Sequence, residues 1–154
     1  MELIRKPENP AKTYLRRYRA LVVQQESLQR SIDDAYERAT SCTVKIKDVH
    51  VDGSGAYDRM AEDVARATDA TAQLQEEKRK VEESLKEILE GINSVHDEMQ
   101  KAVLLMRYVE GLDWIAIQEK IGYERTQAND IHGWALFNVK KWMIQKGLLQ
   151  NSEH

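Results

Sequence analysis

The chain has 154 residues and a net charge of −3, so it holds one ordinary domain, or a small domain with an elongated helical part, and its overall charge excludes a general attraction to polyanions. Glycine and proline are scarce, 32% of residues are charged and 6% are aromatic, which favours helices over a β-sandwich and excludes disorder. Because there is no long apolar run, and because the segment from Met1 to Pro10 lacks the apolar stretch of a signal peptide, we expect a soluble, cytoplasmic, all-α protein without a membrane span.

The first predicted element is a long helix that starts at Asn9 and Pro10 and ends at about Ser41. Asparagine is a good N-cap, proline suits the first helical position, and no glycine or proline interrupts the rest. The apolar residues alternate by four and three, and a glutamine fills the one remaining position. This is the spacing of an a/d coiled-coil seam. Its members are Tyr14, Tyr18, Leu21, Gln25, Leu28, Ile32, Ala35 and Ala39.

A basic ridge of Lys12, Arg16 and Arg19 falls on the side of this helix away from the seam. Residues 1–30 contain seven Lys or Arg and three Asp or Glu, a local charge of +4. The ridge is either a solvated helix face or a surface that contacts nucleic-acid phosphates, because lysine and arginine displace condensed counterions.

The segment from Cys42 to Gly55 breaks the helical periodicity. Apolar and polar residues alternate between Val44 and Val51, so we predict a short hairpin or an extended flap, within a loop over residues 42–56. Cys42 is the only cysteine, which excludes an internal disulfide, and with His50 it makes at most half of a metal site.

Residues 57–99 have the strongest periodic signal in the chain. A helix of this length spans roughly 60 Å and cannot bury its apolar stripe alone. We predict that the first helix folds back against it as an antiparallel hairpin, and that a second protomer covers the rest in a dimer. The stripe consists of Tyr57, Met60, Val64, Ala67, Thr71, Leu74, Lys78, Val81, Leu85, Ile88, Ile92, Val95 and Met99.

Gly91 lowers helix propensity by about 1 kcal/mol and predicts a kink or break. We therefore place a domain boundary there, with a helical oligomerisation stalk over residues 1–92 and a terminal domain over residues 93–154. Residues 31–100 contain nine Lys or Arg and 17 Asp or Glu, a net −8, so the stalk should repel DNA. Its predicted role is dimerisation and spacing.

The terminal domain is predicted to contain three helical pieces, one ending near Tyr108, one over residues 113–121 and one over residues 125–146. Asp113 is placed as an N-cap after Gly111, and Gly122 supplies the left-handed turn at the end of the second piece. This layout predicts a helix-turn-helix.

The stretch LLMRYVEGLDWIAIQEKIGYERTQANDIHGWAL resembles region 4 of bacterial sigma-70 factors. The chain is also similar to small phage and prophage regulators of late-gene transcription of the ArpU and RinA type, strongly over residues 103–139 and weakly elsewhere. The matching elements are Arg107, Tyr108, Gly111, Trp114, Ile117, Ile121, Gly122, Tyr123, Ile131, His132, Ala135 and Leu136. The resemblance implies a phage-encoded regulator that binds double-stranded DNA and can also contact RNA polymerase, and we expect the predicted stalk to pair two copies as a dimer.

In such domains the last helix lies in the major groove with its first residues at the base edges. Carried over to this chain, Arg125 would bind a guanine, Asn129 an adenine, and Thr126 a base or a phosphate. Asp130 can only accept hydrogen bonds, which suits a cytosine amino group, and His132 is expected to be structural. The candidate DNA-binding residues on this helix are Arg125, Thr126, Gln127, Asn129, Asp130, Lys140 and Lys141.

The sequence departs from the family pattern at several positions. Gln118 replaces a small alanine and Ala128 replaces a branched residue, which we interpret as a compensating exchange of volume. Glu124 stands where a serine or threonine would cap the helix and contact a phosphate, and its carboxylate repels the DNA backbone. Residues 97–146 contain seven basic and seven acidic side chains, so one domain alone should bind duplex weakly.

Two other functions remain open. Four apolar residues, Ile115, Trp134, Phe137 and Trp142, could form a protein-interaction surface, or could pack against the stalk or a dimer mate. Alternatively, a helix-turn-helix joined to a helical oligomerisation region resembles the small subunits of phage terminases, which act in DNA packaging. We predict no enzyme activity, cofactor or metal site, because the histidines have neither metal-ligand spacing nor a carboxylate partner around a nucleophile.

Overall fold

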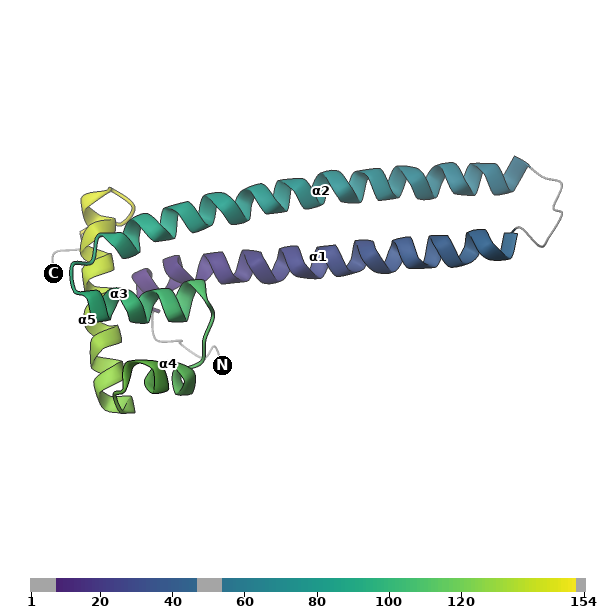
Figure 1. Cartoon of the computed structure of the whole chain (residues 1–154). Coiled ribbons are helices and arrows are strands. Elements are labelled where there is room, and N and C mark those ends of the chain that lie inside the picture. The colour runs from purple at the N-terminus through teal and green to yellow at the C-terminus, as the bar shows by residue number, and fades with distance from the viewer. Residues whose placement is uncertain (1–7, 47–53, 152–154) are drawn as a thin grey trace, which may run out of the picture. The chain divides into compact units, whose positions relative to one another are not determined.

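The computed structural model describes residues 8–46 and 54–151, and none of these residues lies in a β-strand. The elements are α1 (Pro10–Ile46), α2 (Ser54–Asn93), α3 (Glu98–Leu104), the π-helix η1 (Leu105–Val109), α4 (Trp114–Ile121) and α5 (Arg125–Gln145), as labelled in Figure 1. The prediction of an all-α protein is confirmed.

The chain divides into two compact units. One consists of residues 1–20 and 82–154, which we call the terminal unit, and the other of residues 21–81, which we call the distal unit. The terminal unit thus includes the start of α1 and the end of α2, two segments that the sequence analysis assigned to the stalk.

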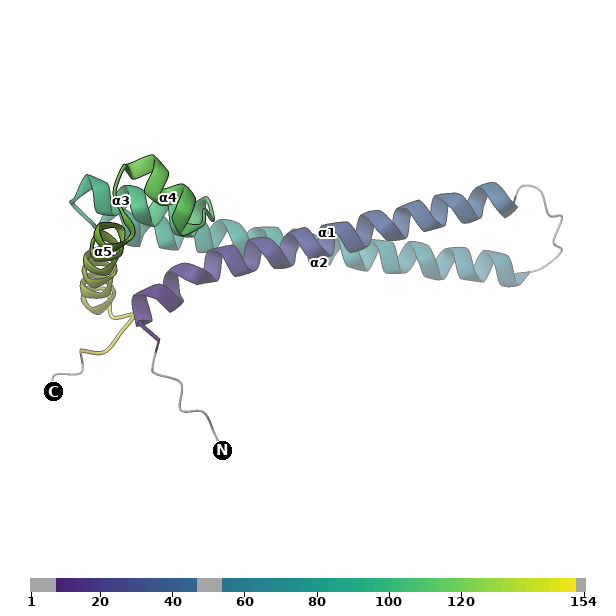
Figure 2. The ribbon, with the colours of Figure 1, turned by 90° about the horizontal axis from the view of Figure 1, so that it is seen from below.

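The distal unit is built from parts of α1 and α2 alone. These parts run side by side in opposite directions (Figures 1 and 2). Ile32 and Leu74 are both buried, each with 7% exposure, whereas Met60 and Val64 are each 60% exposed. The apolar stripe predicted for the second long helix is therefore only partly covered within this unit.

The predicted flap is partly wrong. Helix α1 continues to Ile46, beyond the predicted end near Ser41, so residues 42–46 are helical. No glycine or proline stands between Pro10 and Gly53, and a few alternating residues do not outweigh an uninterrupted helix. The remainder of the predicted flap, residues 47–53, lies outside the described residues.

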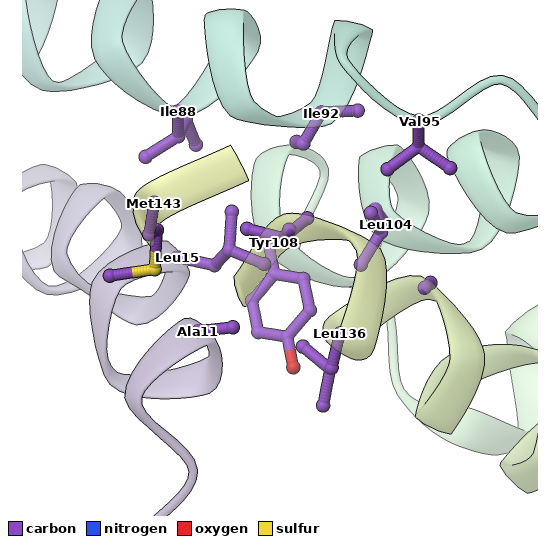
Figure 3. Close-up of a cluster of buried hydrophobic side chains, with 11 residues drawn as sticks. Ala11, Leu15, Ile88, Ile92, Val95, Leu104, Tyr108, Leu136 and Met143 are labelled. Carbon is purple, nitrogen blue, oxygen red and sulfur yellow. The ribbon is translucent and has the colours of Figure 1, made fainter. Parts of the chain in front are cut away.

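A single apolar core holds the terminal unit together (Figure 3). Leu15 of α1 and Ile92 of α2 are fully buried, and each such side chain contributes about 1.5–3 kcal/mol relative to exposure. Tyr108 lies among the labelled side chains of Figure 3, with its ring inside the cluster and its hydroxyl at the edge. The buried members are Ala11, Leu15, Ile88, Ile92, Val95, Leu104, Tyr108, Ala135, Leu136, Val139 and Met143.

The core draws on residues outside the predicted coiled-coil seam. Leu15 has 0% exposure, although it lies next to the seam, whereas Ala11, also at 0%, lies three residues before Tyr14 and extends the seam. The start of α1 thus packs into the terminal core with its seam side, which carries Tyr14 and Tyr18, and with the neighbouring Leu15. Met99, the last residue of the predicted stripe, is 37% exposed, because α2 ends at Asn93 and α3 starts a new direction.

Gly91 marks a close approach between α2 and α5. A Cβ atom at this position would lie 3.0 Å from Cζ3 of Trp142, so any side chain here would require the indole ring to move by a few tenths of an ångström or more. The helix continues two residues past Gly91 and ends at Asn93. Trp142 is half-buried there, with its ring centroid 6.0 Å from that of Tyr14. Of the two alternatives for Trp142, packing against the two long helices is the one that the terminal unit shows.

The predicted helix ends around α4 are confirmed. The carboxylate of Asp113 accepts a hydrogen bond from the backbone N–H of Ala116 at 2.8 Å, and Gly122 adopts a left-handed conformation with φ of 73°. The π-helix η1 is not predicted by the sequence. Its wide turn, closed by a hydrogen bond from Glu110 N–H to Leu105 O at 3.0 Å, contains Arg107 and Tyr108.

Candidate nucleic-acid interface

The first turns of α5 expose the polar residues that the sequence analysis singled out. Arg125, Thr126, Asn129 and Asp130 are all exposed, while Ala128, in the middle of this stretch, is fully buried. The helical period of 3.6 residues thus keeps one small residue against the core and turns its neighbours outward.

The backbone at the start of α5 is open to a ligand. Glu124 is the N-cap residue, but its side chain makes no capping hydrogen bond. The first N–H groups of α5 therefore keep their hydrogen-bonding capacity, and the helix dipole places partial positive charge at this end.

A groove of about 330 Å³ separates the exposed sides of α4 and α5. Its polar lining consists of two amides, on Gln118 and Asn129, and one guanidinium, on Arg125. Trp114 and Ile115 supply the apolar lining. The half-buried side chain of Gln118 lines this groove, while Ala128 is fully buried, and the compensating exchange of volume stays an interpretation.

The remaining candidates on α5 lie farther along the helix. Gln127, Lys140 and Lys141 are exposed, and the two lysines come roughly 22 Å after Arg125 along the axis. The ammonium of Lys141 lies 5.8 Å from the centre of the Phe137 ring. These two lysines therefore form a surface separate from the first turn of α5.

Trp134 and Phe137 form an exposed aromatic pair on α5. They are 62% and 51% exposed, and their ring centroids lie 5.8 Å apart with planes at 86°. Ile115, which is 72% exposed, lines the groove beside Arg125 instead. The four predicted interaction residues therefore divide into this pair, the groove residue Ile115 and the packed Trp142.

The predicted basic ridge on α1 is not a plain solvated face. Arg16 forms an ion pair with Glu8, and the guanidinium of Arg19 lies against Gly111 in the turn before α4. Lys12 is half-buried. All three belong to the terminal unit, where Arg16 and Arg19 line one pocket together with Arg107. Arg107 is one of the residues that carry the resemblance to sigma-70 region 4, but the sequence alone predicts no role for it.

His132 is a packing residue. Its Nε2 lies 2.7 Å from the hydroxyl of Tyr108, and its ring meets that of Trp114 edge-on at 4.7 Å. Burial lowers the pKa of His132 to about 4, helped by the positive charges of Lys12, Arg107 and Arg16. The imidazole is therefore neutral at pH 7 and joins η1 to α5.

The part of the chain that the structure describes contains no cluster of three His, Cys, Asp or Glu side chains that could hold a metal ion. No helix within the same residues is long and apolar enough to cross a membrane. Comparisons with protein-family models, with curated proteins and with solved structures find no match for this chain.

Proposed function

We propose that this protein is a sequence-specific DNA-binding transcription regulator of phage origin, in which α4 and α5 form a helix-turn-helix and a helical hairpin stalk pairs two chains. The observation that carries the proposal is the exposed first turn of α5, where Arg125, Thr126 and Asn129 project away from the buried Ala128. This stretch has the side chains and the open helix start that base and phosphate contacts require.

Arg125 and Asn129 would supply the specificity. A guanidinium can bind guanine through O6 and N7, an amide can bind adenine through N6 and N7, and each such contact discriminates by about 1–3 kcal/mol. Both residues line the groove with Gln118, which adds a third polar group within reach of base edges or a phosphate.

Dimerisation would supply affinity that one copy lacks. Residues 97–146 contain seven basic and seven acidic side chains, so a single recognition surface gains little from charge. The exposed apolar residues Met60 and Val64 in the distal unit are the surface that we assign to a second chain. Two paired recognition helices would then read two half-sites of an operator.

The test is selection of binding sites by the full chain from random duplex DNA, followed by titrations of the selected duplex at several salt concentrations. We expect enrichment of one motif with a repeated half-site, and an affinity that falls as salt rises. Asn129→Ala should weaken binding to the selected duplex about tenfold and leave binding to unrelated duplex unchanged. Gln73→Ala, at an exposed position of the distal unit, is the matched control.

Failure to enrich any motif, together with an affinity that ignores sequence and salt, would exclude the proposal. The second candidate is then a protein-interaction module, which the exposed Trp134 and Phe137 pair favours. Capture of proteins from phage-infected cells with the wild type and with Trp134→Ala tests this alternative. Loss of a captured protein from a variant that remains folded would support it.

A further inference from the structure

A cluster of positively charged side chains in the terminal unit lies outside the groove between α4 and α5. A pocket of about 210 Å³ is lined by Arg16 and Arg19 from α1, by Arg107 and Tyr108 from η1, and by Gly111 from the turn that follows. We call this site the arginine pocket. Its three guanidinium groups come from two segments about 90 residues apart in the chain.

The carboxylates of the described residues do not balance these charges. Glu8 pairs with Arg16, and no described Asp or Glu forms an ion pair with Arg19 or Arg107. Three guanidinium groups around one pocket repel one another, and a single carboxylate offsets only part of that repulsion. The pocket therefore has the charge of a site for an anion.

Other contacts hold Arg107 and Arg19 in place without neutralising them. Arg107 donates a hydrogen bond from Nη1 to the carbonyl oxygen of Leu112 at 3.0 Å, and its guanidinium lies 5.2 Å from the centre of the Trp114 ring. The Arg19 guanidinium lies so close to Gly111 that a Cβ there would be 2.7 Å from Nε. These contacts reduce the number of orientations that the side chains would lose on binding a ligand.

The positive charges of the arginine pocket affect the pKa values of the neighbouring Tyr108 and His132. Burial raises the pKa of Tyr108 to about 12, although Arg16 and Arg107 act in the opposite direction. The positive charges of Lys12, Arg107 and Arg16 also add to the burial that keeps His132 neutral. Near neutral pH both rings are therefore uncharged, and neither offsets the positive charge of the arginines.

We propose that the arginine pocket binds a phosphate group. The planar guanidinium forms paired hydrogen bonds with phosphate oxygens, and arginine is the preferred residue wherever such paired contacts recognise phosphate. The phosphate comes either from the backbone of bound DNA, which would depend on the function proposed above, or from free phosphate or a small phosphomonoester. Glu8 competes with it for Arg16, so phosphate binding displaces or shares this ion pair.

The experiment follows the side-chain Nε–Hε signals of Arg16, Arg19 and Arg107 by NMR in the full chain. The probes are inorganic phosphate, with chloride at equal ionic strength as the control, and a short duplex. We expect saturable shifts of the three signals with inorganic phosphate and none with chloride. Absence of a saturable shift with both phosphate and duplex would overturn the proposal.

Variants separate the pocket from general charge effects. Arg19→Gln and Arg107→Gln should each weaken phosphate binding about tenfold, as expected for the loss of a charge-assisted contact. Glu8→Gln should strengthen it, because the competing carboxylate is removed. Lys86→Gln removes an exposed positive charge of the terminal unit outside the pocket and should have no effect. Equal effects of Arg19→Gln and Lys86→Gln would overturn the proposal, and Arg19→Gln keeps this test valid if Arg107→Gln does not fold.

The two sources of phosphate give different results with duplex DNA. If the phosphate belongs to the DNA backbone, Arg19→Gln lowers the affinity of the chain equally for all duplex sequences and reduces the salt dependence of binding by about one counterion. If the ligand is free phosphate, it saturates the pocket without changing the affinity for duplex DNA. Phosphate binding without any duplex binding would support the pocket and exclude the proposed function. Sequence-specific duplex binding without shifts of the arginine NMR signals would support the proposed function and exclude phosphate binding in the pocket.

Discussion

The hydroxyl of Tyr108 lies 2.7 Å from Nε2 of His132, across the interface between η1 and α5. The hydroxyl is protonated near neutral pH, which lies far below the pKa of Tyr108, raised by burial to about 12, and the imidazole is neutral because burial lowers the pKa of His132 to about 4. A neutral imidazole nitrogen can accept from this hydroxyl, whereas protonation makes Nε2–H the donor and places a charge in a half-buried site near Lys12, Arg107 and Arg16.

Stability should fall in acid because of His132. The unfolded histidine binds a proton near pH 6.5, whereas the folded one resists protonation until about pH 4, so stability present above pH 6.5 is lost as the pH falls toward 4. We expect a loss of about 1–2 kcal/mol, less than the full shift implies, because the ring is part-exposed. Chemical denaturation of the wild type and of His132→Gln at several pH values measures this loss of unfolding free energy. An unchanged difference between the two proteins from pH 7 to pH 4 would contradict this prediction.

Gly91 should not tolerate a side chain. Gly91→Val would push the added atoms into the indole of Trp142, so we expect a loss of about 1–3 kcal/mol. Gly133→Ala is the matched change, because Gly133 is exposed in α5 and a Cβ there meets nothing within 4 Å. It should raise stability by roughly 0.5–1 kcal/mol through helix propensity. Thermal unfolding measures the stability of both variants. Equal changes in stability would show that the contact between Gly91 and Trp142 is not tight.

Glu124→Ser should improve the start of α5 in two ways. The wild-type side chain makes no capping hydrogen bond, whereas serine can accept one from the backbone and add about 0.5–1 kcal/mol of stability. Removal of the carboxylate should also strengthen duplex binding at low salt, because a negative charge beside the DNA backbone is lost. Denaturation and duplex titration of the same variant measure both effects. Higher stability with unchanged duplex affinity would argue that the start of α5 does not face DNA.

The distal unit should form the dimer contact. Replacement of the exposed Met60 and Val64 by serine removes apolar surface that we assign to a second chain, so the double variant should dissociate at concentrations where the wild type is dimeric. Analytical ultracentrifugation and native mass spectrometry measure the mass. A monomeric wild type would contradict the prediction that the distal unit pairs two chains. A ring of many chains would instead favour the DNA-packaging alternative.

Local signals in the sequence were sufficient for both ends of α4 and for the start of α5. Asp113 and Gly122 act within a few residues of their own backbone, as a cap and as a left-handed turn, so their positions in the sequence predict where α4 begins and ends. The same reasoning predicted that Arg125 and Asn129 share the exposed start of α5, because one helical turn brings them to the same side. The absence of glycine and proline over long stretches predicted an all-α chain.

Other features depend on contacts between distant segments. No local pattern pairs Gly91 with Trp142, or Arg107 with Arg16 and Arg19, because these residues meet only after α1, α2 and α5 pack around one core. Sequence periodicity identifies the apolar side of a helix but not what covers it. For that reason the tertiary structure, and not the heptad spacing, determined that α1 begins in the terminal core and that its arginines surround a pocket.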